Sequence, residues 1–148
     1  MKVRDIMTAS VDSIQSTDTI GDAARVMAEH DLGVLPVLSN RALVGIVTDR
    51  DIAVRGVAAG LSSEAPIRRV MTEDVRVCSP DDEIEDVLEI MSSAQIRRLP
   101  VCRRGEEVIG IVALADAVRR DSEKRDAAVA LAEICHPRGV HCQSALFA

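Results

Sequence analysis

The sequence predicts a mixed α/β (α+β) fold, built from two β-α-β-β-α repeats packed with pseudo-two-fold symmetry and followed by a C-terminal helical extension. Three observations lead to this prediction. Residues 4–58 recur as residues 68–122. Both copies show the same order of apolar patterns. Hydrophobic residues make up 47% of the 148-residue chain, which is enough for a core shared by two small halves.

The duplication is carried by short identical stretches. They are shifted by 64 residues or, after a one-residue insertion, by 65: Met7-Thr8 returns as Met71-Thr72, Leu35-Pro36-Val37 as Leu99-Pro100-Val101, and Gly45-Ile46-Val47 as Gly110-Ile111-Val112. A period of this length indicates two copies of one supersecondary unit, each covering the apolar face of the other. We divide the chain into repeat 1 (1–59), a linker (60–66), repeat 2 (67–122) and a C-terminal helix and tail (123–148).

Each repeat is expected to begin with a short strand, at Val11–Ile14 and at Val75–Cys78. An amphipathic helix follows, and its apolar residues begin at Ile20 in repeat 1 and at Ile84 in repeat 2. The candidate N-caps of these helices are Thr17 or Asp18 in the first copy and Ser79 or Asp81 in the second.

A β-hairpin comes next in each repeat, with turns at residues 39–42 and 103–107. A second helix is expected at Asp49–Ala59 and from Leu114 onward. Arg50 and Arg55 on the first of these helices are expected to be surface charges. After repeat 2, apolar spacing predicts a helix that runs through Ile134 and ends before Pro137 and Gly139.

Composition limits the class of protein. The net charge of −6 and the single aromatic residue argue against nucleic-acid binding, which favours basic faces and aromatic stacking platforms. No apolar stretch approaches the roughly 18 residues of a membrane span, and the N-terminus lacks the apolar region of a signal peptide. We therefore expect no membrane association, a cytoplasmic location and four reduced cysteines.

The sharpest local motif is the stretch Gly45–Asp51. A buried strand ends at Val47, and Thr48 stands at the start of a helix, where unpaired backbone N–H groups attract anions and hydroxyl oxygens. Asp51, one turn later, could accept two hydrogen bonds from vicinal hydroxyls such as those of ribose. The alternative is purely structural, with Thr48 as an N-cap and Asp51 stabilising the helix dipole.

The doubled pattern resembles a pair of cystathionine β-synthase (CBS) domains, also called a Bateman module. The resemblance covers residues 3–122 and rests on Asp5–Thr8, Leu35–Val37, Gly45–Asp51, Val70–Thr72, Arg97–Val101, and Gly110–Val112 with Asp116. The chain also looks like the stand-alone actinobacterial members of this family, through the stretch Asp49–Leu61 and the short tail around Cys135 and Pro137. A bacterial origin would fit.

The resemblance implies a regulatory module that binds an adenosyl ligand, AMP, ADP, ATP or S-adenosylmethionine, in clefts between the repeats. Thr48 and Asp51 would then hold phosphate and ribose, with the base against Val11 and Ile14. In family members that bind phosphates, basic residues reach across from the other repeat, and Arg97 and Arg98 occupy that position. Pro100, beside the arginines, and Asp116, the counterpart of Asp51, complete the candidate ligand-binding residues.

The mirror cleft departs from the family pattern. Ala113 replaces the threonine, and Gly33 and Val34 stand opposite Arg97 and Arg98. We therefore predict one competent site and one weak or empty site. The alternative to phosphate binding is that Arg97 and Arg98 are solvated side chains at the start of a strand, paired with Glu106 or Glu107.

The cysteines and histidines offer few further sites. Cys135, His136, His141 and Cys142 could in principle hold zinc, but their spacing matches no standard finger, and a tail with free thiols is the reading we favour. No metal and no required cofactor are therefore predicted. Cys78 and Cys102 are expected to be buried as small hydrophobes.

The sequence contains no set of nucleophile and base that would suggest an enzyme. The expected function is a homodimer, packed through Ala53, Val54, Val57 and Ala58, that signals in trans to an unidentified protein partner. The alternative is a stress-response or interaction protein that binds no nucleotide and acts through its dimer surface or its Cys/His tail.

Overall fold

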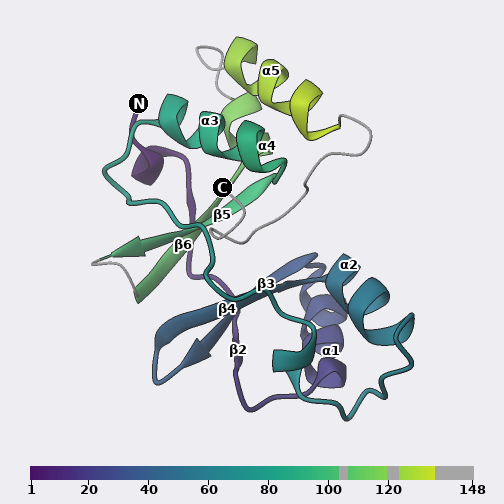
Figure 1. Ribbon diagram of the computed structural model, residues 1–148. Helices are drawn as coiled ribbons and strands as arrows, with labels where there is room; N and C mark the ends of the chain where they lie inside the picture. Colours follow the sequence, from purple (N-terminus) through teal and green to yellow (C-terminus); the bar gives the residue numbers. More distant parts are fainter. Residues whose placement is uncertain (104–106, 120–123, 136–148) are drawn as a thin grey trace. The chain divides into compact units, whose positions relative to one another are not determined.

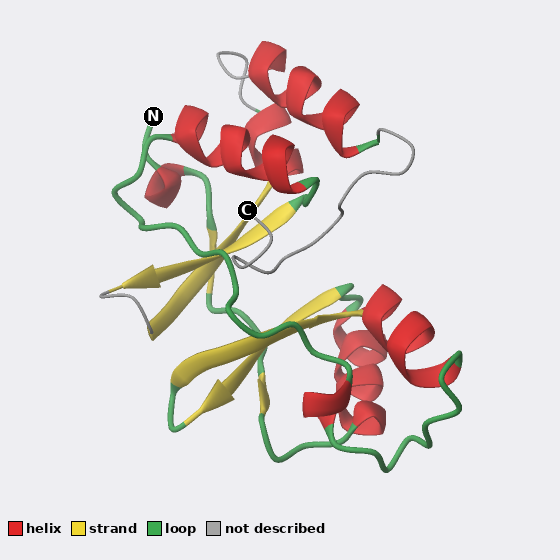
Figure 2. Ribbon diagram, in the orientation of Figure 1, coloured by secondary structure: helices red, strands yellow, loops and turns green. Residues whose placement is uncertain are grey.

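The computed structural model describes residues 1–103, 107–119 and 124–135, and it separates into two compact units. Unit 2 is the continuous stretch Asp12–Val75, whereas unit 1 combines Met1–Val11 with Arg76–Ala148. Figures 1 and 2 show both units as a small sheet covered on one face by helices. The predicted mixed α/β class is confirmed.

Unit 2 contains a three-stranded sheet. β2 (Ile14–Gln15) runs parallel to β3 (Val34–Ser39), and β3 is antiparallel to β4 (Ala42–Thr48). The β3–β4 turn consists of Asn40 and Arg41, both with positive φ, which suits a tight two-residue hairpin. The helices are α1 (Ile20–His30), α2 (Asp49–Asp51), the π-helical η2 (Ile52–Val57) and the 3₁₀ turn η3 (Ile67–Arg69).

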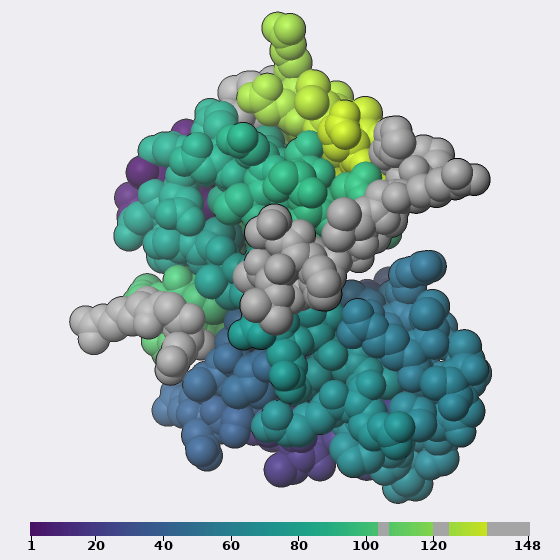
Figure 3. All heavy atoms as spheres, in the orientation of Figure 1, coloured from purple at the N-terminus to yellow at the C-terminus, as the bar shows by residue number. Residues whose placement is uncertain are grey.

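Unit 1 repeats this plan. The 3₁₀ turn η1 (Val3–Asp5) leads into β1 (Thr8–Ala9), which pairs antiparallel with β6 (Glu107–Ala113), and β6 pairs in turn with β5 (Arg98–Arg103). α3 (Ile84–Ala94) and α4 (Leu114–Val118) cover the sheet. The predicted C-terminal helix is α5 (Lys124–Ile134), which packs on α3 and α4 as an outer layer (Figure 3).

Each unit takes its leading segment from the other repeat. Val3 and Ile6, from the start of repeat 1, are buried in the core around α3. Their counterparts 64 residues later, Ile67 and Val70, are buried in the core around α1. The first strand follows the same rule, because Thr8 pairs with Ile111 on β6 and Thr72 bridges Ile46 on β4. The two repeats have therefore exchanged equivalent segments.

Two strand glycines make this exchange possible. A Cβ at Gly110 would lie 2.8 Å from the Thr8 carbonyl oxygen, and a Cβ at Gly45 would lie 2.6 Å from Met71 Sδ. Both distances are well inside van der Waals contact. At Gly110 the neighbour is backbone, so a side chain would push the exchanged segment off the sheet, whereas at Gly45 the Met71 side chain would have to move and the Thr72 carbonyl oxygen would lie 3.1 Å away. The glycine of each repeated Gly-Ile-Val is thus set by close packing against the exchanged segment.

Several predicted element boundaries are wrong. The strand placed at Val11–Ile14 begins at Ile14, and the strand placed at Val75–Cys78 is reduced to isolated bridge residues at its two ends, of which Cys78 pairs with Val101. The N-cap of α1 is Thr19, one residue later than the nearer candidate, because Thr19 and Asp22 form a reciprocal capping box. In repeat 2, Glu83 occupies the cap position without a side-chain cap hydrogen bond, and Ser79 and its neighbours form a separate turn.

Candidate functional site

The predicted ribose and phosphate residues meet at the end of β4. Thr48 is the N-cap of α2, and its Oγ1 accepts the Asp51 N–H at 3.1 Å. In return, Asp51 Oδ2 accepts the Thr48 N–H at 2.9 Å. The structural role considered for this pair is therefore present, and it fixes the rotamers of both side chains.

This cap leaves capacity for a ligand. An ionised carboxylate offers about four lone-pair sites, and the capping box occupies one of them. The second oxygen, Asp51 Oδ1, lies 3.8 Å from Arg55 Nε, and only 17% of the Asp51 side chain is exposed. The Thr48 hydroxyl uses its oxygen as an acceptor and, within the described residues, donates its hydrogen to no protein group. A half-buried carboxylate beside a hydroxyl donor matches the needs of a polyhydroxylated, anionic ligand.

Arg55 is exposed, as expected of a surface charge, with 45% of its side chain accessible, but its guanidinium also contacts oxygen atoms of a neighbouring segment. Its Nη1 lies 3.2 Å from the Val70 carbonyl oxygen, 3.3 Å from the Met71 carbonyl oxygen and 3.3 Å from Thr72 Oγ1. The guanidinium thus contacts the segment that unit 2 takes from repeat 2. The sequence could not indicate this, because main-chain acceptors leave no residue pattern.

Ala113, the residue of repeat 2 equivalent to Thr48, has the same backbone conformation and lacks the hydroxyl group. Ala113 has φ −115° and ψ 151°, close to the −114° and 162° of Thr48, and its N–H donates to Asp116 Oδ2 at 2.8 Å. The return bond from the Asp116 N–H has no side-chain acceptor, since alanine offers none. The two candidate sites thus differ in one hydroxyl group on the same scaffold.

Arg97 and Arg98 are exposed at the entry to β5 in unit 1. The Leu114 N–H donates to the Arg97 carbonyl oxygen at 2.9 Å, as the Asp49 N–H donates to the Gly33 carbonyl oxygen at 3.1 Å. These matching bonds support the alignment of Arg97 with Gly33.

The pairing that we considered for the two arginines is not found with Glu107. That residue is in register with Arg103, at the other end of the hairpin. Glu106 lies outside the described residues. Among those that are described, neither arginine side chain has a hydrogen-bond or ion-pair partner.

The remaining predicted residues divide between the units. Ile14 is 4% exposed and belongs to the core of unit 2, the unit that also holds Thr48 and Asp51. Val11, Pro100 and Asp116 belong to unit 1, as do the two arginines. The shared cleft implied by the family resemblance therefore stays a prediction.

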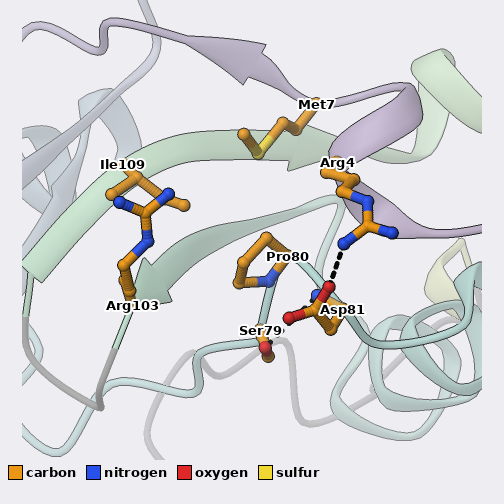
Figure 4. Close-up of a pocket in the computed structure, with 7 residues that line it drawn as sticks. All are labelled: Arg4, Met7, Ser79, Pro80, Asp81, Arg103 and Ile109. Carbon is orange, nitrogen blue, oxygen red and sulfur yellow. Dashed lines mark hydrogen bonds and ion pairs between the residues drawn. The ribbon is translucent and has the colours of Figure 1, made fainter.

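A pocket of about 430 Å³ lies elsewhere in unit 1 (Figure 4). Its apolar lining residues are Met7, Pro80 and Ile109. Of the two arginines that line it, Arg4 forms an ion pair with Asp81. None of the predicted ligand-binding residues lines this pocket, so it is distinct from the candidate site.

The thiols of the strands are buried, as expected. Burial raises the pKa of Cys78 to about 12 and that of Cys102 to about 11, which keeps both as unreactive thiols at neutral pH. Cys135 is exposed, whereas His136, His141 and Cys142 lie outside the described residues. Within the residues that are described, no cluster of His, Cys, Asp or Glu could hold a metal ion.

No helix in the described part of the chain is long and apolar enough to span a membrane.

Residues 3–56 and 67–123 match the family model of the CBS domain, so the chain belongs to the CBS domain family as a domain pair. Proteins with such a pair are in general regulatory. The chain is 37% identical over 134 residues to the CBS domain-containing protein YhcV of Bacillus subtilis (strain 168), covering 90% of this chain and 95% of that protein. The resemblance to the stand-alone group is also confirmed. Hypoxic response protein 1 of Mycobacterium tuberculosis (strain ATCC 25618 / H37Rv) is 36% identical over 118 residues, 78% of this chain and 82% of that protein.

Solved structures agree with this assignment. A crystal structure of Hypoxic Response Protein I with two coordinated zinc ions matches with a TM-score of 0.74 and 35% identity, over 81% of this chain and 98% of that one. The CBS domain pair of protein MJ0100, in complex with 5′-methylthioadenosine and S-adenosyl-L-methionine, matches with a TM-score of 0.72 and 30% identity, over 80% and 94%.

Proposed function

We propose that this protein is a stand-alone regulatory module that binds an adenosyl ligand, AMP, ADP, ATP or S-adenosylmethionine, and signals in trans to a protein partner. The observation that carries the proposal is the preorganised pair of Thr48 and Asp51 at the end of β4. Support from outside the chain is the MJ0100 domain pair, which was solved with two adenosyl compounds. The module regulates and does not catalyse, and it requires no cofactor.

Within this proposal, Asp51 accepts hydrogen bonds from the ribose hydroxyls and Thr48 donates to a phosphate or carboxylate oxygen. Arg97 and Arg98 supply the opposing positive charge from repeat 2, and Val11, Ile14 and Pro100 form apolar surroundings for the base. The site of repeat 2, with Asp116 but without a threonine, binds weakly or not at all. The supporting observation is that Ala113 reproduces the backbone of Thr48 and lacks its hydroxyl.

A homodimer is part of the same proposal. Ala53, Val54, Val57 and Ala58 are all exposed along η2 and its C-terminal end, with Val54 and Val57 at 51% and 71%. Apolar side chains gathered on one short helix favour burial against a second copy.

The test is isothermal titration of the purified protein with AMP, ATP and S-adenosylmethionine in turn. We expect one binding site per chain for at least one of them. Asp51→Ala should abolish binding, and Asp116→Ala is the matched control, because it removes the same capping carboxylate from the other repeat. Two equal sites, or binding that survives Asp51→Ala, would contradict the proposal.

One observation favours a second candidate function. The Hypoxic Response Protein I structure contains two zinc ions, although we predict no metal for this chain. If this chain acts through its Cys/His tail and binds no nucleotide, a native mass spectrum of freshly purified protein will show retained zinc and no nucleotide. Retained nucleotide without zinc supports the first function, and the same spectrum gives the number of subunits.

A further inference from the structure

The side chain of Arg55 stands between the candidate ligand carboxylate and the segment Val70–Thr72. Its Nε lies 3.8 Å from Asp51 Oδ1. Its Nη1 lies within 3.3 Å of three oxygen atoms of that segment. One guanidinium therefore touches both, and every contact lies inside unit 2.

The segment Val70–Thr72 is well fixed in unit 2. Val70 is fully buried and Met71 is 6% exposed. The Thr72 N–H donates to the Ile46 carbonyl oxygen at 2.8 Å, and the Ile46 N–H donates back to Thr72 at 3.0 Å. Val75, three residues later, is the last residue of unit 2, so this is the segment by which the chain leaves the unit.

Local backbone geometry explains how Arg55 reaches so far. It lies in η2, whose wider turn is closed by an i→i+5 hydrogen bond from the Ala58 N–H to the Ala53 carbonyl oxygen. Gly56 is buried, and a Cβ there would lie 3.6 Å from both Ile20 and Val70. Both are ordinary van der Waals distances, so η2 packs directly against Val70 at Gly56, and the neighbouring Arg55 extends along the segment. A planar guanidinium can hold a carboxylate and several carbonyl groups at once, which a lysine ammonium cannot do with the same geometry.

The counterpart carboxylate in repeat 2 has a different partner. Asp116 Oδ1 lies 3.8 Å from Arg119 Nη1, an i,i+3 contact from a side chain that is 79% exposed. Arg119 forms no hydrogen bond to the Met7-Thr8 segment in the described part of the chain. The position equivalent to Arg55 is residue 120, outside the described residues. The link described here is therefore established for the repeat that carries the complete Thr-Asp pair.

We propose that Arg55 is a positioning residue that couples the state of Asp51 to the exchanged segment Val70–Thr72. The proposal deepens the function proposed above and rests on it for the identity of the ligand. Hydroxyl groups that bind Asp51 compete for the carboxylate oxygen facing Arg55, which redistributes the guanidinium between the carboxylate and the segment. Because coupling between two sites is reciprocal, the stability of the segment then depends on the occupancy of Asp51.

The first test needs no ligand. Residue-level amide hydrogen exchange is measured by NMR for the Thr72 and Ile46 amides, normalised to buried amides of β3. Arg55→Gln should raise exchange at both amides at least about fivefold, since it removes the contacts that hold the segment. Arg50→Gln is the control, because Arg50 is an exposed arginine on α2 and should change the rates by less than about twofold.

Coupling is measured by a double-mutant cycle. Asp51→Asn should also raise exchange at Thr72, and should add almost nothing in the Arg55→Gln background, since the link is already broken. Arg55→Lys keeps the charge and loses the planar guanidinium, so its exchange rate at Thr72 should lie between those of the wild type and Arg55→Gln. Equal exchange in Arg55→Gln and Arg50→Gln, or independent effects of Asp51→Asn and Arg55→Gln, would overturn the proposal.

The second test uses AMP, ATP and S-adenosylmethionine as probes. Binding should change exchange at Thr72 in the wild type and in Arg50→Gln, whereas Arg55→Gln should bind and show no such response. If a probe binds and the wild-type Thr72 amide does not respond, the coupling is refuted and the ligand function stands. If no probe binds, the ligand function fails, and the cycle without ligand still decides whether Asp51 and Arg55 are coupled.

Discussion

Exchanging the two cap residues, Thr48→Ala and Ala113→Thr, tests whether the repeats differ by a single hydroxyl. The backbone at the two positions differs by 1° in φ and 11° in ψ. Both carboxylates already accept the N–H of the cap residue, at 2.9 Å and 2.8 Å. A threonine at 113 should therefore accept the Asp116 N–H as Thr48 accepts the Asp51 N–H, without any movement of the chain.

The size of the effect follows from measured N-caps. Replacing a capping threonine by alanine costs about 1 kcal/mol, within a range of roughly 0.5–2 kcal/mol. Thr48→Ala should lower the free energy of unfolding by about that amount, and Ala113→Thr should raise it by a similar amount. For a chain of this length the corresponding change in Tm is about 2–4 °C in each direction. The double exchange should return the protein close to wild-type stability.

The assay is urea denaturation followed by far-UV circular dichroism, repeated for all four proteins at one pH and salt concentration. An Ala113→Thr protein no more stable than the wild type, beside a destabilised Thr48→Ala protein, would refute the equivalence of the two caps. The same four proteins extend the titration experiment. If the hydroxyl also decides ligand binding, Ala113→Thr should add binding at repeat 2, and Thr48→Ala should weaken it at repeat 1.

Four further predictions concern the described residues of unit 1. Gly110→Ala should destabilise the protein by about 1–3 kcal/mol, because the new methyl group would lie 2.8 Å from a carbonyl oxygen. Gly33→Ala is the control in the same denaturation assay. It should be close to neutral, because the nearest neighbour of its methyl group is an exposed carboxylate at 3.3 Å. At pH 8, Cys78 should resist a thiol reagent while Cys135 reacts. Mass spectrometry of the labelled protein checks this, and Cys78 should become labelled only when denaturant is added. Since folding raises the pKa of the Cys78 thiol to about 12, the unfolded chain loses its proton first, so stability should fall as pH rises from 9 towards 12, and Cys78→Ala should flatten that fall. Gln95→Ala removes a 2.6 Å hydrogen bond to the C-terminal end of α5, so proteolysis should cleave before or within α5 faster than in the wild type, while unit 2 stays equally resistant.

Much of the fold could be predicted because its signals are local. The hairpins follow from alternating apolar stretches around short polar turns, and the capping pair Thr48–Asp51 follows from residue types three positions apart. The same three-residue spacing at Thr19 and Asp22 gives the true start of α1, and it was present in the sequence.

The exchange of leading segments could not be derived from periodicity. A strand pattern shows which face of a segment is buried and does not show which sheet it joins. One signal pointed to the exchange, since a glycine inside a strand indicates close approach of another chain segment, and Gly45 and Gly110 occupy equivalent places. Arg55 is exposed as expected, but its contacts could not be predicted for a related reason, because its acceptors are fifteen to seventeen residues away along the chain.

The exchanged segments also determine the order in which the two units can fold during synthesis. The first eleven residues leave the ribosome long before β6, the strand to which Thr8 and Ala9 pair, has been made. Unit 2 is continuous in sequence and can close once Val75 has emerged, whereas unit 1 must wait for residues more than a hundred positions downstream. Late, long-range closure of this kind slows folding and leaves an unpaired strand exposed in the meantime. In the nascent chain, residues 12–75 should therefore fold first, and residues 1–11 should pair with β6 last.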